Sequence, residues 1–490
     1  MAATVQLDDV QGLVVRGYSG LKSACFLLLT IADPTAARLA LGRLAPRVTN
    51  GRRAPRETAV HLALTSDGLR RLNLETPDIE GFSGEFVTGM TDTDRSRFLG
   101  DLGEEAPGRW RWGGPGTPPV HVLLLLYALD GPALERLEDD VRRDALADGG
   151  LAETARLDTA DLGDHEPFGF RDGISQPLVE GLPKARAARA LQGARAAGRQ
   201  DGAGADVVRA GEFVLGYPNE YGLLTDRPLL PASYDPEHLL PRGPDGTADL
   251  GRNGTYLVLR QLRQDVEGFW SYLEDVTRRQ DGSGDLAARD ALAARLVGRW
   301  PSGAPLVHAP LKDDPALATD NDFGYFATDP DGLRCPLGAH IRRAHPRDSL
   351  DPQPGSARSV AIDRRHRILR RGRAYGPGSA AGDGGGERGL HFLCLNANIS
   401  RQFEFIQHTW LNNPSFNGLH DGPDPLVAPH RDSRATFTVQ ARPLRTRYRD
   451  LPQFVSVRGG AYFFLPGLRA LRYLCSTGRT TAAAPAGGRR

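Results

Sequence analysis

The sequence predicts an α+β fold built from two similar halves, in which antiparallel sheets carry helices on one face. Apolar segments of strand length alternate with capped or amphipathic segments of helix length. The order β-α-β-β-α-β occurs twice along the 490 residues. A hydrophobic fraction of 40% and a charged fraction of 25% are ordinary for a globular protein, and a chain of this length can bury large cores.

The first half opens with an apolar run at residues 24–31, which is typical of a buried strand. Asp33 and Pro34 then begin a helix, with Asp33 as its cap and Pro34 in its first turn. The other elements expected in this half are a strand at 59–64, a short helix from Ser66, a strand at 120–127 and an amphipathic helix at 132–146.

The second half repeats this order. Its expected elements are strands at 255–260, 390–395 and 461–465, a helix at 266–277 and a helix through 403–410. Units of this order form antiparallel sheets with helices on one face, so we expect two ferredoxin-like domains. The expected boundaries are 1–215 for the first domain, 216–475 for the second and 476–490 for a flexible tail. An insertion near 184–205 and a flexible glycine-rich segment at 376–386 are also expected.

Charge and cysteine usage exclude several classes of function. The formal net charge of +1 provides no general attraction for nucleic acid or an anionic membrane. No apolar run approaches the ~20 residues needed to span a bilayer. The four cysteines form no CxxC pair, so neither a disulfide framework nor a zinc ribbon is expected, and Cys25 and Cys394 are predicted to be buried. Because the N-terminus lacks the features of a secretory signal, we expect a cytoplasmic protein.

A tight turn at residues 169–177 carries the first candidate catalytic residue. Gly169 and Gly173 flank Asp172, and glycines let the backbone bend sharply and approach another body closely. This arrangement suits a carboxylate held over a large flat group such as a cofactor. The same residues also suit an ordinary Asp-Gly turn between two strands.

A second group of candidates lies within the fourteen residues 335–348, which include two histidines, three arginines and Cys335. His340 follows the small residues Gly338 and Ala339, which would let a bulky planar group come close. A neutral imidazole is a good ligand for iron, copper or zinc, and arginine pairs well with carboxylates such as haem propionates. The alternative is a positively charged surface strand with one partly buried histidine.

The third group is the basic segment at 366–377. Ile368 and Leu369 indicate a buried strand that delivers Arg370 inward and ends at Gly372. A solvated basic run is the alternative for this segment taken alone.

Together the three groups resemble the dye-decolorizing peroxidase family. Gly169, Asp172 and Gly173 match its GxxDG motif. Segment 335–347 looks like the one that carries the family's proximal haem histidine, and segment 370–377 is similar to the one that holds its distal arginine. The similarity continues through 82–90, 402–410 and 458–464. It covers nearly the whole chain and is closer to the larger bacterial and fungal branches of the family. The family's fold, two ferredoxin-like halves around a haem, agrees with the order of elements above.

The resemblance implies roles for individual residues. His340 would be the metal ligand and hold the haem iron from the proximal side, whereas Asp172 and Arg370 would occupy the distal side, where peroxide binds. Asp172 would take a proton from peroxide and return it to the leaving oxygen. Arg370 would stabilise the negative charge that develops as the O–O bond breaks, and it would keep Asp172 ionised in acid.

Two further cofactor-binding residues are expected. A haem-binding histidine needs a hydrogen-bond acceptor on its other ring nitrogen. Asp424 resembles the family's acidic partner in this position, and Glu404 is the competing candidate. Arg347 is expected to pair with a haem propionate.

Four other residues remain open in the sequence. Spacing alone excludes neither His345 nor His366 as the metal ligand, although His340 is the position that matches the family. His345 departs from the family pattern, in which a small amide is more common. Tyr375 and Trp410 match regions from which the family passes electrons to the haem, and a simple core position is the alternative for Trp410.

The predicted function is that of a peroxidase, an oxidoreductase that uses the iron of haem b. It would reduce hydrogen peroxide and oxidise bulky organic substrates such as dyes and phenols. The alternatives are a haem carrier or sensor with little turnover, and a non-haem metalloprotein that uses His340 and Cys335. Hydrogen peroxide and small organic reductants are the expected partners. The sequence leaves the natural reductant and the oligomeric state open, and a homo-oligomer is compatible with it.

Overall fold

The computed structural model describes residues 4–72, 74, 76–188, 207–377, 386–430 and 435–476. Most of the expected insertion at 184–205, most of the glycine-rich segment at 376–386 and nearly all of the expected tail therefore lie outside the described residues.

One large antiparallel sheet forms the centre of the part of the chain that the structure describes. Its strands follow the order β10-β12-β9-β15-β2-β3-β1-β4, and β11 pairs with β12 at one edge. The strands are β1 (Ser23–Ile31), β2 (Thr58–Leu64), β3 (Val122–Ala128), β4 (Leu151–Asp158), β9 (Thr255–Gln264), β10 (Leu369–Arg370), β11 (Arg373–Tyr375), β12 (Gly389–Asn396) and β15 (Val455–Leu465).

The strand order confirms the prediction of two ferredoxin-like halves. In the first half, β4, β1, β3 and β2 lie side by side, and in the second half β15, β9, β12 and β10 do so. Within each half, the first and third strands in sequence therefore occupy the centre. The two halves join where β15 pairs with β2 through Phe464 and Leu64. The domain boundary at 215 stays a prediction, because the hydrogen-bonded sheet continues from one half into the other.

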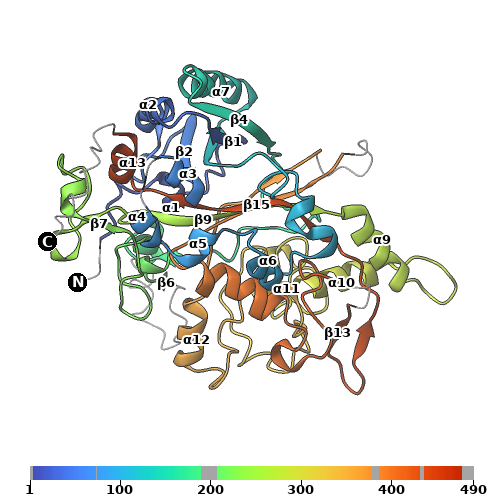
Figure 1. The fold of residues 1–490 in the computed structure, drawn as a ribbon. Coiled ribbons are helices and arrows are strands. Elements are labelled where there is room, and N and C mark those ends of the chain that lie inside the picture. The colour runs from blue at the N-terminus through green and yellow to red at the C-terminus, as the bar shows by residue number, and fades with distance from the viewer. Residues whose placement is uncertain are drawn as a thin grey trace.

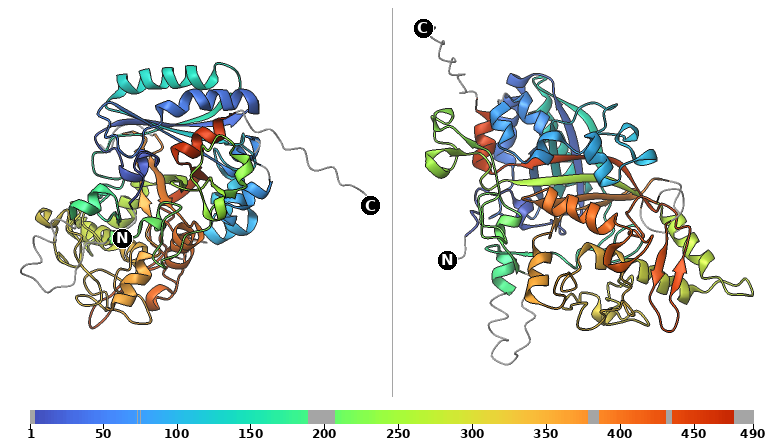
Figure 2. Two further views of the ribbon diagram at one scale, coloured as in Figure 1. Left: turned by 90° about the vertical axis from the view of Figure 1, so that its left-hand side faces the viewer. Right: turned by 60° about the horizontal axis from the view of Figure 1, so that its bottom comes forward.

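The two longest helices of the first half lie on one face of the sheet (Figure 1; Figure 2). They are α2 (Pro34–Leu44) and α7 (Gly131–Leu146), and both begin as the sequence indicates. The Asp33 carboxylate accepts from the backbone N–H of Ala36, and the Asp130 carboxylate accepts from that of Ala133. Each cap satisfies a backbone donor that the first helical turn would otherwise leave unpaired.

The continuous apolar run of β1 is explained by burial on both faces. Cys25, Leu27 and Leu29 pack in the core that includes α2 and α7, whereas Phe26 and Leu28 pack in the core on the opposite face. Cys25 and Cys394 are both buried free thiols, as predicted.

The second half contains the expected helix α9 (Val266–Val276) and a wide helix with π-type hydrogen bonding, η8 (Ser400–Glu404) and η9 (Ile406–Leu411). Its strand β15 is longer than expected, because it begins at Val455 rather than at 461. Gly459 and Gly460 lie in the added part of the strand. These glycines leave room for the side chains of Trp112 and Met90, which a Cβ atom would meet at 2.5 and 2.7 Å.

The long connections of the second half lie on the side of the molecule opposite to α2 and α7 (Figure 1). They carry α10 (Leu286–Val297), α11 (His340–Ala344), α12 (Ala357–Arg364) and the hairpin of β13 (Phe437–Val439) and β14 (Thr446–Tyr448). Together with η9 they cover the sheet and enclose the cavity described below.

Shorter elements complete the fold. They are α1 (Gly12–Val15), α3 (Ser66–Arg71), α4 (Thr76–Glu80), α5 (Gly84–Thr88), α6 (Thr93–Leu99), β5 (Leu178–Val179), β6 (Val207–Val208), β7 (Leu229–Leu230), β8 (Ala248–Asp249) and α13 (Leu468–Cys475). Among the helices of the described residues, none has both the length and the apolar character that crossing a membrane requires.

Candidate active site

A cavity of about 290 Å³ lies between the central sheet and the segments that cover it. Much of its wall is apolar. Leu262, Leu390 and Phe392 contribute from the sheet, and Ile406 and Leu411 contribute from η9. The polar side chains that face this apolar surface can therefore act in surroundings of low dielectric constant.

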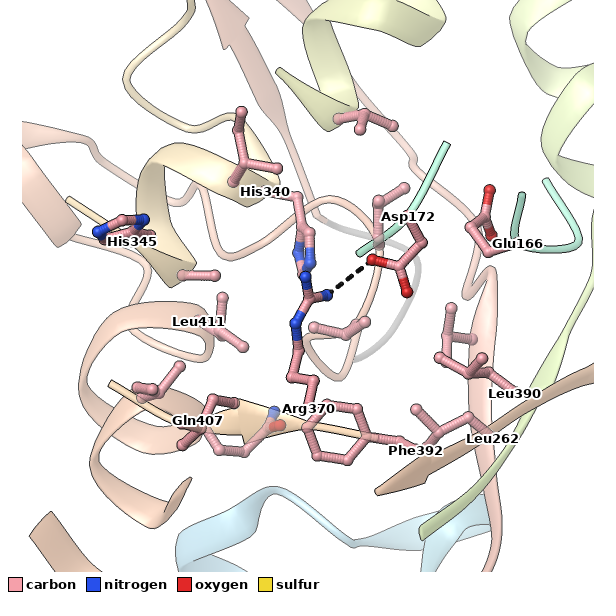
Figure 3. A pocket seen from close by; sticks show the side chains of 18 of the residues that line it. Glu166, Asp172, Leu262, His340, His345, Arg370, Leu390, Phe392, Gln407 and Leu411 are labelled. Carbon is pink, nitrogen blue, oxygen red and sulfur yellow. Dashed lines mark hydrogen bonds and ion pairs between the residues drawn. The ribbon is translucent and has the colours of Figure 1, made fainter. Parts of the chain in front are cut away.

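His340 is the first residue of helix α11, and its imidazole lines the cavity (Figure 3). Its Nδ1 lies 2.9 Å from Oδ2 of Asp424, a residue with no exposed surface. The other oxygen of Asp424 accepts from the backbone N–H groups of Leu426 and Val427 at 3.0 and 2.9 Å. The carboxylate is thus held firmly and fixes the ring of His340, with Nε2 as the nitrogen left for a ligand.

Electrostatics favour the charged form of Asp424. Burial alone would raise the pKa of its carboxyl, but His340, Arg343 and a backbone N–H outweigh burial, and the pKa lies below its ordinary value. For His340, burial lowers the pKa and Asp424 raises it, with a net increase. The lowered pKa of Asp424 and the raised pKa of His340 both describe an ionised carboxylate that accepts a hydrogen bond from Nδ1–H.

Asp172 projects into the same cavity from the glycine-flanked turn. Gly169 and Gly173 have φ angles of +96° and +79°, a region that side chains other than glycine rarely adopt. The backbone N–H of Asp172 donates to the carbonyl of Asp164 at 2.8 Å. Its Oδ1 accepts from the N–H of Gly173 at 2.6 Å and from Nη1 of Arg370 at 3.0 Å.

Arg370 is held by β10, which pairs with β12, and its backbone N–H donates to Oε1 of Gln176 at 3.1 Å. Its side chain enters the cavity from the side opposite to His340 (Figure 3). Asp172 and Arg370 keep 42% and 32% of their side-chain surfaces accessible, and both line the cavity, so a ligand could reach them. Burial would raise the pKa of Asp172, but Arg370 and Gly173 outweigh it, and the net pKa is lowered.

One end of the cavity is positively charged. Arg299 is 4% exposed, and its guanidinium donates to the carbonyls of Gly303 and Asp320 at 2.7 Å and to Oδ1 of Asn321 at 3.2 Å. All three acceptors are neutral. Burial, together with the nearby Arg347, lowers the pKa of Arg299 to about 10. A buried cation held only by neutral acceptors favours an anionic group in the adjoining cavity.

Arg347, which the sequence singled out, lies at the same end of the cavity. Its guanidinium donates to the carbonyls of Asn321 and Phe323 and stacks over the ring of Phe323 at 3.9 Å. These contacts hold the planar group in place.

The chain is 31% identical to a dye-decolorizing peroxidase of Mycena epipterygia over 456 residues, which cover 84% of this chain and 75% of that protein. It is 29% identical to dye-decolorizing peroxidase msp1 of Mycetinis scorodonius over 507 residues, 97% of this chain and 88% of that protein. The crystal structure of the dye-decolorizing peroxidase of Auricularia auricula-judae superposes with a TM-score of 0.75 and 26% identity, covering 96% of this chain and all of that one. No family model matches the chain.

The chain belongs to the dye-decolorizing peroxidase family. It is therefore a peroxidase, and the resemblance noted in the sequence is confirmed.

In this dye-decolorizing peroxidase, His345 also lines the cavity, at the end of α11. Its Nδ1 lies 3.0 Å from the hydroxyl of Ser175, and its Nε2 lies 3.0 Å from Oδ2 of Asp363 and 2.6 Å from Nη1 of Arg367. Both ring nitrogens are engaged by protein groups. His340 is thus placed for a ligand, whereas His345 connects α11 to the loop that follows Asp172.

Three residues that the sequence left open as a metal ligand or an electron relay lie outside the cavity wall of the peroxidase. His366 is stacked on Phe405 at 3.9 Å, and its Nδ1 lies 2.6 Å from the carbonyl of Arg401. Trp410 is 5% exposed and packs in the same core cluster as Phe405. Tyr375 stacks on His391 with ring centroids 4.6 Å apart.

Glu404, the competitor of Asp424, is bound elsewhere. Its carboxylate accepts from Arg95 at 2.6 Å and from the hydroxyl of Tyr462 at 2.7 Å. Glu404 is a buried charge, with only 2% of its surface exposed.

Cys335 is fully buried beside Trp300 and Tyr325 in a separate core cluster and does not line the cavity. Burial raises the pKa of its thiol to about 12. Within the residues that the structure describes, no group of three His, Cys, Asp or Glu side chains could hold a metal ion. These observations argue against a non-haem metal site built on His340 and Cys335.

Among the polar residues of the cavity wall that sequence reasoning missed are Arg299, Glu166 and Gln264. Glu166 stands six residues before Asp172, in the segment that leads into the turn. Its closeness to Asp172 in sequence could have singled out Glu166 as a candidate site residue. Arg299 and Gln264 carried no such signal, since only the packing of α10 and β9 brings them to the cavity.

Proposed function

We propose that this peroxidase binds haem b in the cavity, with His340 as its proximal ligand, and reduces hydrogen peroxide while oxidising bulky organic molecules such as dyes and phenols. The observation that carries the proposal is the placement of His340 opposite the Asp172–Arg370 pair in one largely apolar cavity. A solved relative of similar fold, with a TM-score of 0.76 and 26% identity, is described as having a haem pocket.

The residues present fit haem. A flat apolar macrocycle suits walls formed by Leu262, Phe392 and Leu411. Carboxylate groups at its edge suit the charged end, where Arg299 is a buried cation with neutral acceptors. Arg347 would contribute to the same end.

Bound haem would supply the iron centre at which peroxide is reduced and the oxidising power that the organic substrate consumes. The protein contributes position, charge and proton transfer. Asp424 accepts the hydrogen bond from Nδ1–H of His340 and so sets the tautomer and the direction of the ring.

On the opposite side of the cavity, Asp172 acts as the acid–base group. Its carboxylate takes a proton from one oxygen of hydrogen peroxide and returns a proton to the other oxygen, which leaves as water. Arg370 keeps Asp172 ionised and stabilises the negative charge that develops as the O–O bond breaks. We call the part of the wall formed by Asp172 and Arg370 the distal side.

This pair favours turnover over a haem carrier or sensor, because a binding protein needs no acid–base group beside a fixed cation. The cytoplasmic location and the homo-oligomer stay predictions from the sequence.

The test is the absorption spectrum of the purified, haem-loaded protein before and after one equivalent of hydrogen peroxide. We expect a Soret band that changes within the mixing time of a stopped-flow instrument and returns when a phenol or dye is added. A protein with no Soret band after loading would contradict haem binding. A Soret band that changes slowly or bleaches would support the carrier instead.

A further inference from the structure

A second carboxyl group, that of Glu166, lies in the cavity wall beside Asp172 (Figure 3). Its Oε1 accepts from the backbone N–H of Phe170 at 2.9 Å. Its Oε2 accepts from the backbone N–H of Phe168 at 3.0 Å and from Nε2 of Gln264 at 2.7 Å. Three donors therefore converge on a single carboxyl group.

These contacts shape the turn that presents Asp172. The backbone of Glu166 exchanges further hydrogen bonds with the same turn, from its N–H to the carbonyl of Phe170 at 2.9 Å and from the N–H of Gly169 to its carbonyl at 2.8 Å. Asp172 follows only two residues after Phe170. Loss of the Glu166 carboxyl would leave buried backbone donors unpaired and release the turn.

Gln264 on β9 can accommodate Glu166 in either protonation state. Its Oε1 is buried and has no hydrogen-bond partner among the described residues. An amide rotated by half a turn exchanges its oxygen and nitrogen at nearly the same positions. In the orientation that the structure shows, Nε2 donates to an ionised Glu166. In the rotated orientation, Oε1 would accept from a protonated Glu166. A hydrogen bond joins the two side chains in both states.

The charges around Glu166 differ from those around Asp172. Arg370 binds Asp172, and no cation binds Glu166 among the described residues. The other charged groups nearby have partners of their own. Arg171 and His165 pair with Asp164, and Arg260 pairs with Asp101. Asp265 caps helix α9. Burial first, and the charge of Asp172 in addition, raise the pKa of Glu166 to about 7.

We propose that Glu166 is a positioning and proton-holding residue of the distal side, which keeps the turn under Asp172 in place and switches the charge of this side by ionising. The proposal rests on the proposed function of Asp172 and Arg370. With Glu166 neutral, the charges of Asp172 and Arg370 cancel. With Glu166 ionised, the distal side carries one net negative charge, which opposes the negative charge that develops on peroxide during cleavage.

The first measurement is the infrared difference spectrum of the haem-loaded protein between acid and alkaline pH. We expect a carboxylic acid band in the wild type that disappears as pH rises through neutrality. Glu166→Gln should remove the part of this band that belongs to Glu166, whereas Glu105, a second carboxyl of the cavity wall whose pKa burial raises to about 7, should keep its own part. Asp164→Asn is the matched control, because it removes a carboxylate of the same loop that does not line the cavity, and it should retain the band.

The second measurement is the pH profile of the rate constant for reaction with hydrogen peroxide. The wild-type rate should fall about tenfold as Glu166 ionises, the effect of one added charge near the reacting group at intermediate dielectric constant. Glu166→Gln should abolish this fall, and Asp164→Asn should keep it. Glu166→Ala should lower the rate at every pH, because it also removes the acceptor that holds the turn.

Gln264→Leu provides an independent test should Glu166→Gln fail to fold. The hydrogen bond from Gln264 lowers the pKa of Glu166, so its removal should move the loss of the infrared band to higher pH. The proposal is overturned if the band keeps its full intensity in Glu166→Gln, if Asp164→Asn weakens it as well, or if the alkaline fall in rate is the same with and without Glu166. The part of the infrared band that Glu166→Gln removes does not depend on the reaction with peroxide, so a normal rate in Asp172→Asn would refute the role of Asp172 separately.

Discussion

Nδ1 of His340 lies 2.9 Å from Oδ2 of Asp424, although 84 residues separate them in sequence. Asp424 is completely buried and is held by two backbone N–H groups as well. A histidine ring fixed in this way presents Nε2 to the cavity in a defined direction. This pair is the structural basis of the proximal assignment, and it leads to the first two predictions.

We expect His340→Ala to be purified with little or no haem, because the cavity loses the nitrogen ligand that Asp424 orients. The Soret absorbance per protein after haem loading measures this. His408→Ala is the matched control, since His408 is exposed and stacks on Phe98 outside the cavity. Full haem retention by His340→Ala would refute the proximal assignment.

Asp424→Asn should weaken haem binding or peroxidase activity by about 10- to 100-fold, the usual cost of losing a partner that orients a metal ligand. The amide keeps the size of the carboxylate but loses its charge, so the Nδ1–H bond becomes weaker. Haem titration and the rate with peroxide are the measurements. Asp421→Asn, at an exposed site three residues earlier, should behave as the wild type.

Asp172→Asn should slow the reaction with hydrogen peroxide by about 10²- to 10⁴-fold, because the acid–base group is lost. Arg370→Leu should slow it by about 10²- to 10³-fold, because the developing charge is no longer stabilised. Stopped-flow absorbance checks both rates, and the Soret band of the resting protein checks that haem is still bound. Wild-type rates in both variants would show that the distal side lies elsewhere.

The pH dependence in acid should report Asp172. Its pKa is lowered in the folded protein, since Arg370 and Gly173 outweigh burial. The base must be ionised, so activity is present above this lowered pKa and is lost as pH falls through it. Arg370→Leu removes the cation and raises the pKa of Asp172, so the acid limb of kcat/KM for peroxide should move to higher pH. Arg370→Lys should move it less. An acid limb that stays in place in Arg370→Leu would contradict the assignment.

The ion pair of Arg260 and Asp101 should be important for stability. Both side chains are buried, at 3% and 2% exposure, and they line one end of the cavity. Asp101→Asn leaves a buried guanidinium without its counter-charge and should lower the free energy of unfolding by about 3–5 kcal/mol. Denaturant unfolding measures the change. The double variant Asp101→Asn with Arg260→Met should recover much of the loss, and no recovery would argue against an effect of charge.

Much of the fold could be predicted because its signals are local. The apolar run of β1, the cap at Asp33 and the amphipathic pattern of α7 each depend on residues within a few positions of one another. Elements without such signals were missed or shortened. Strand β4 has only two buried residues among its eight, and the strand expected at 461–465 begins six residues earlier, at Val455.

The candidate site was predictable in part. Asp172 and His340 stand in compact motifs, and Arg370 follows a short apolar pair. The choice of Asp424 over Glu404 rested on the family resemblance alone, because both are acidic residues far from His340 in sequence. Packing separates them: the loop after η9 brings Asp424 to His340, whereas Glu404 meets Arg95 and Tyr462.

The sequence by itself determined the two β-α-β-β-α-β halves and the residue types able to bind haem and handle peroxide, since these depend on local periodicity and short motifs. Only the tertiary structure decided which side chains meet. Asp172 reaches Arg370 across 198 residues, and Glu166 meets Gln264 across 98. Such contacts depend on how the sheet and its covering segments pack, and packing is set by the whole chain rather than by neighbours in sequence.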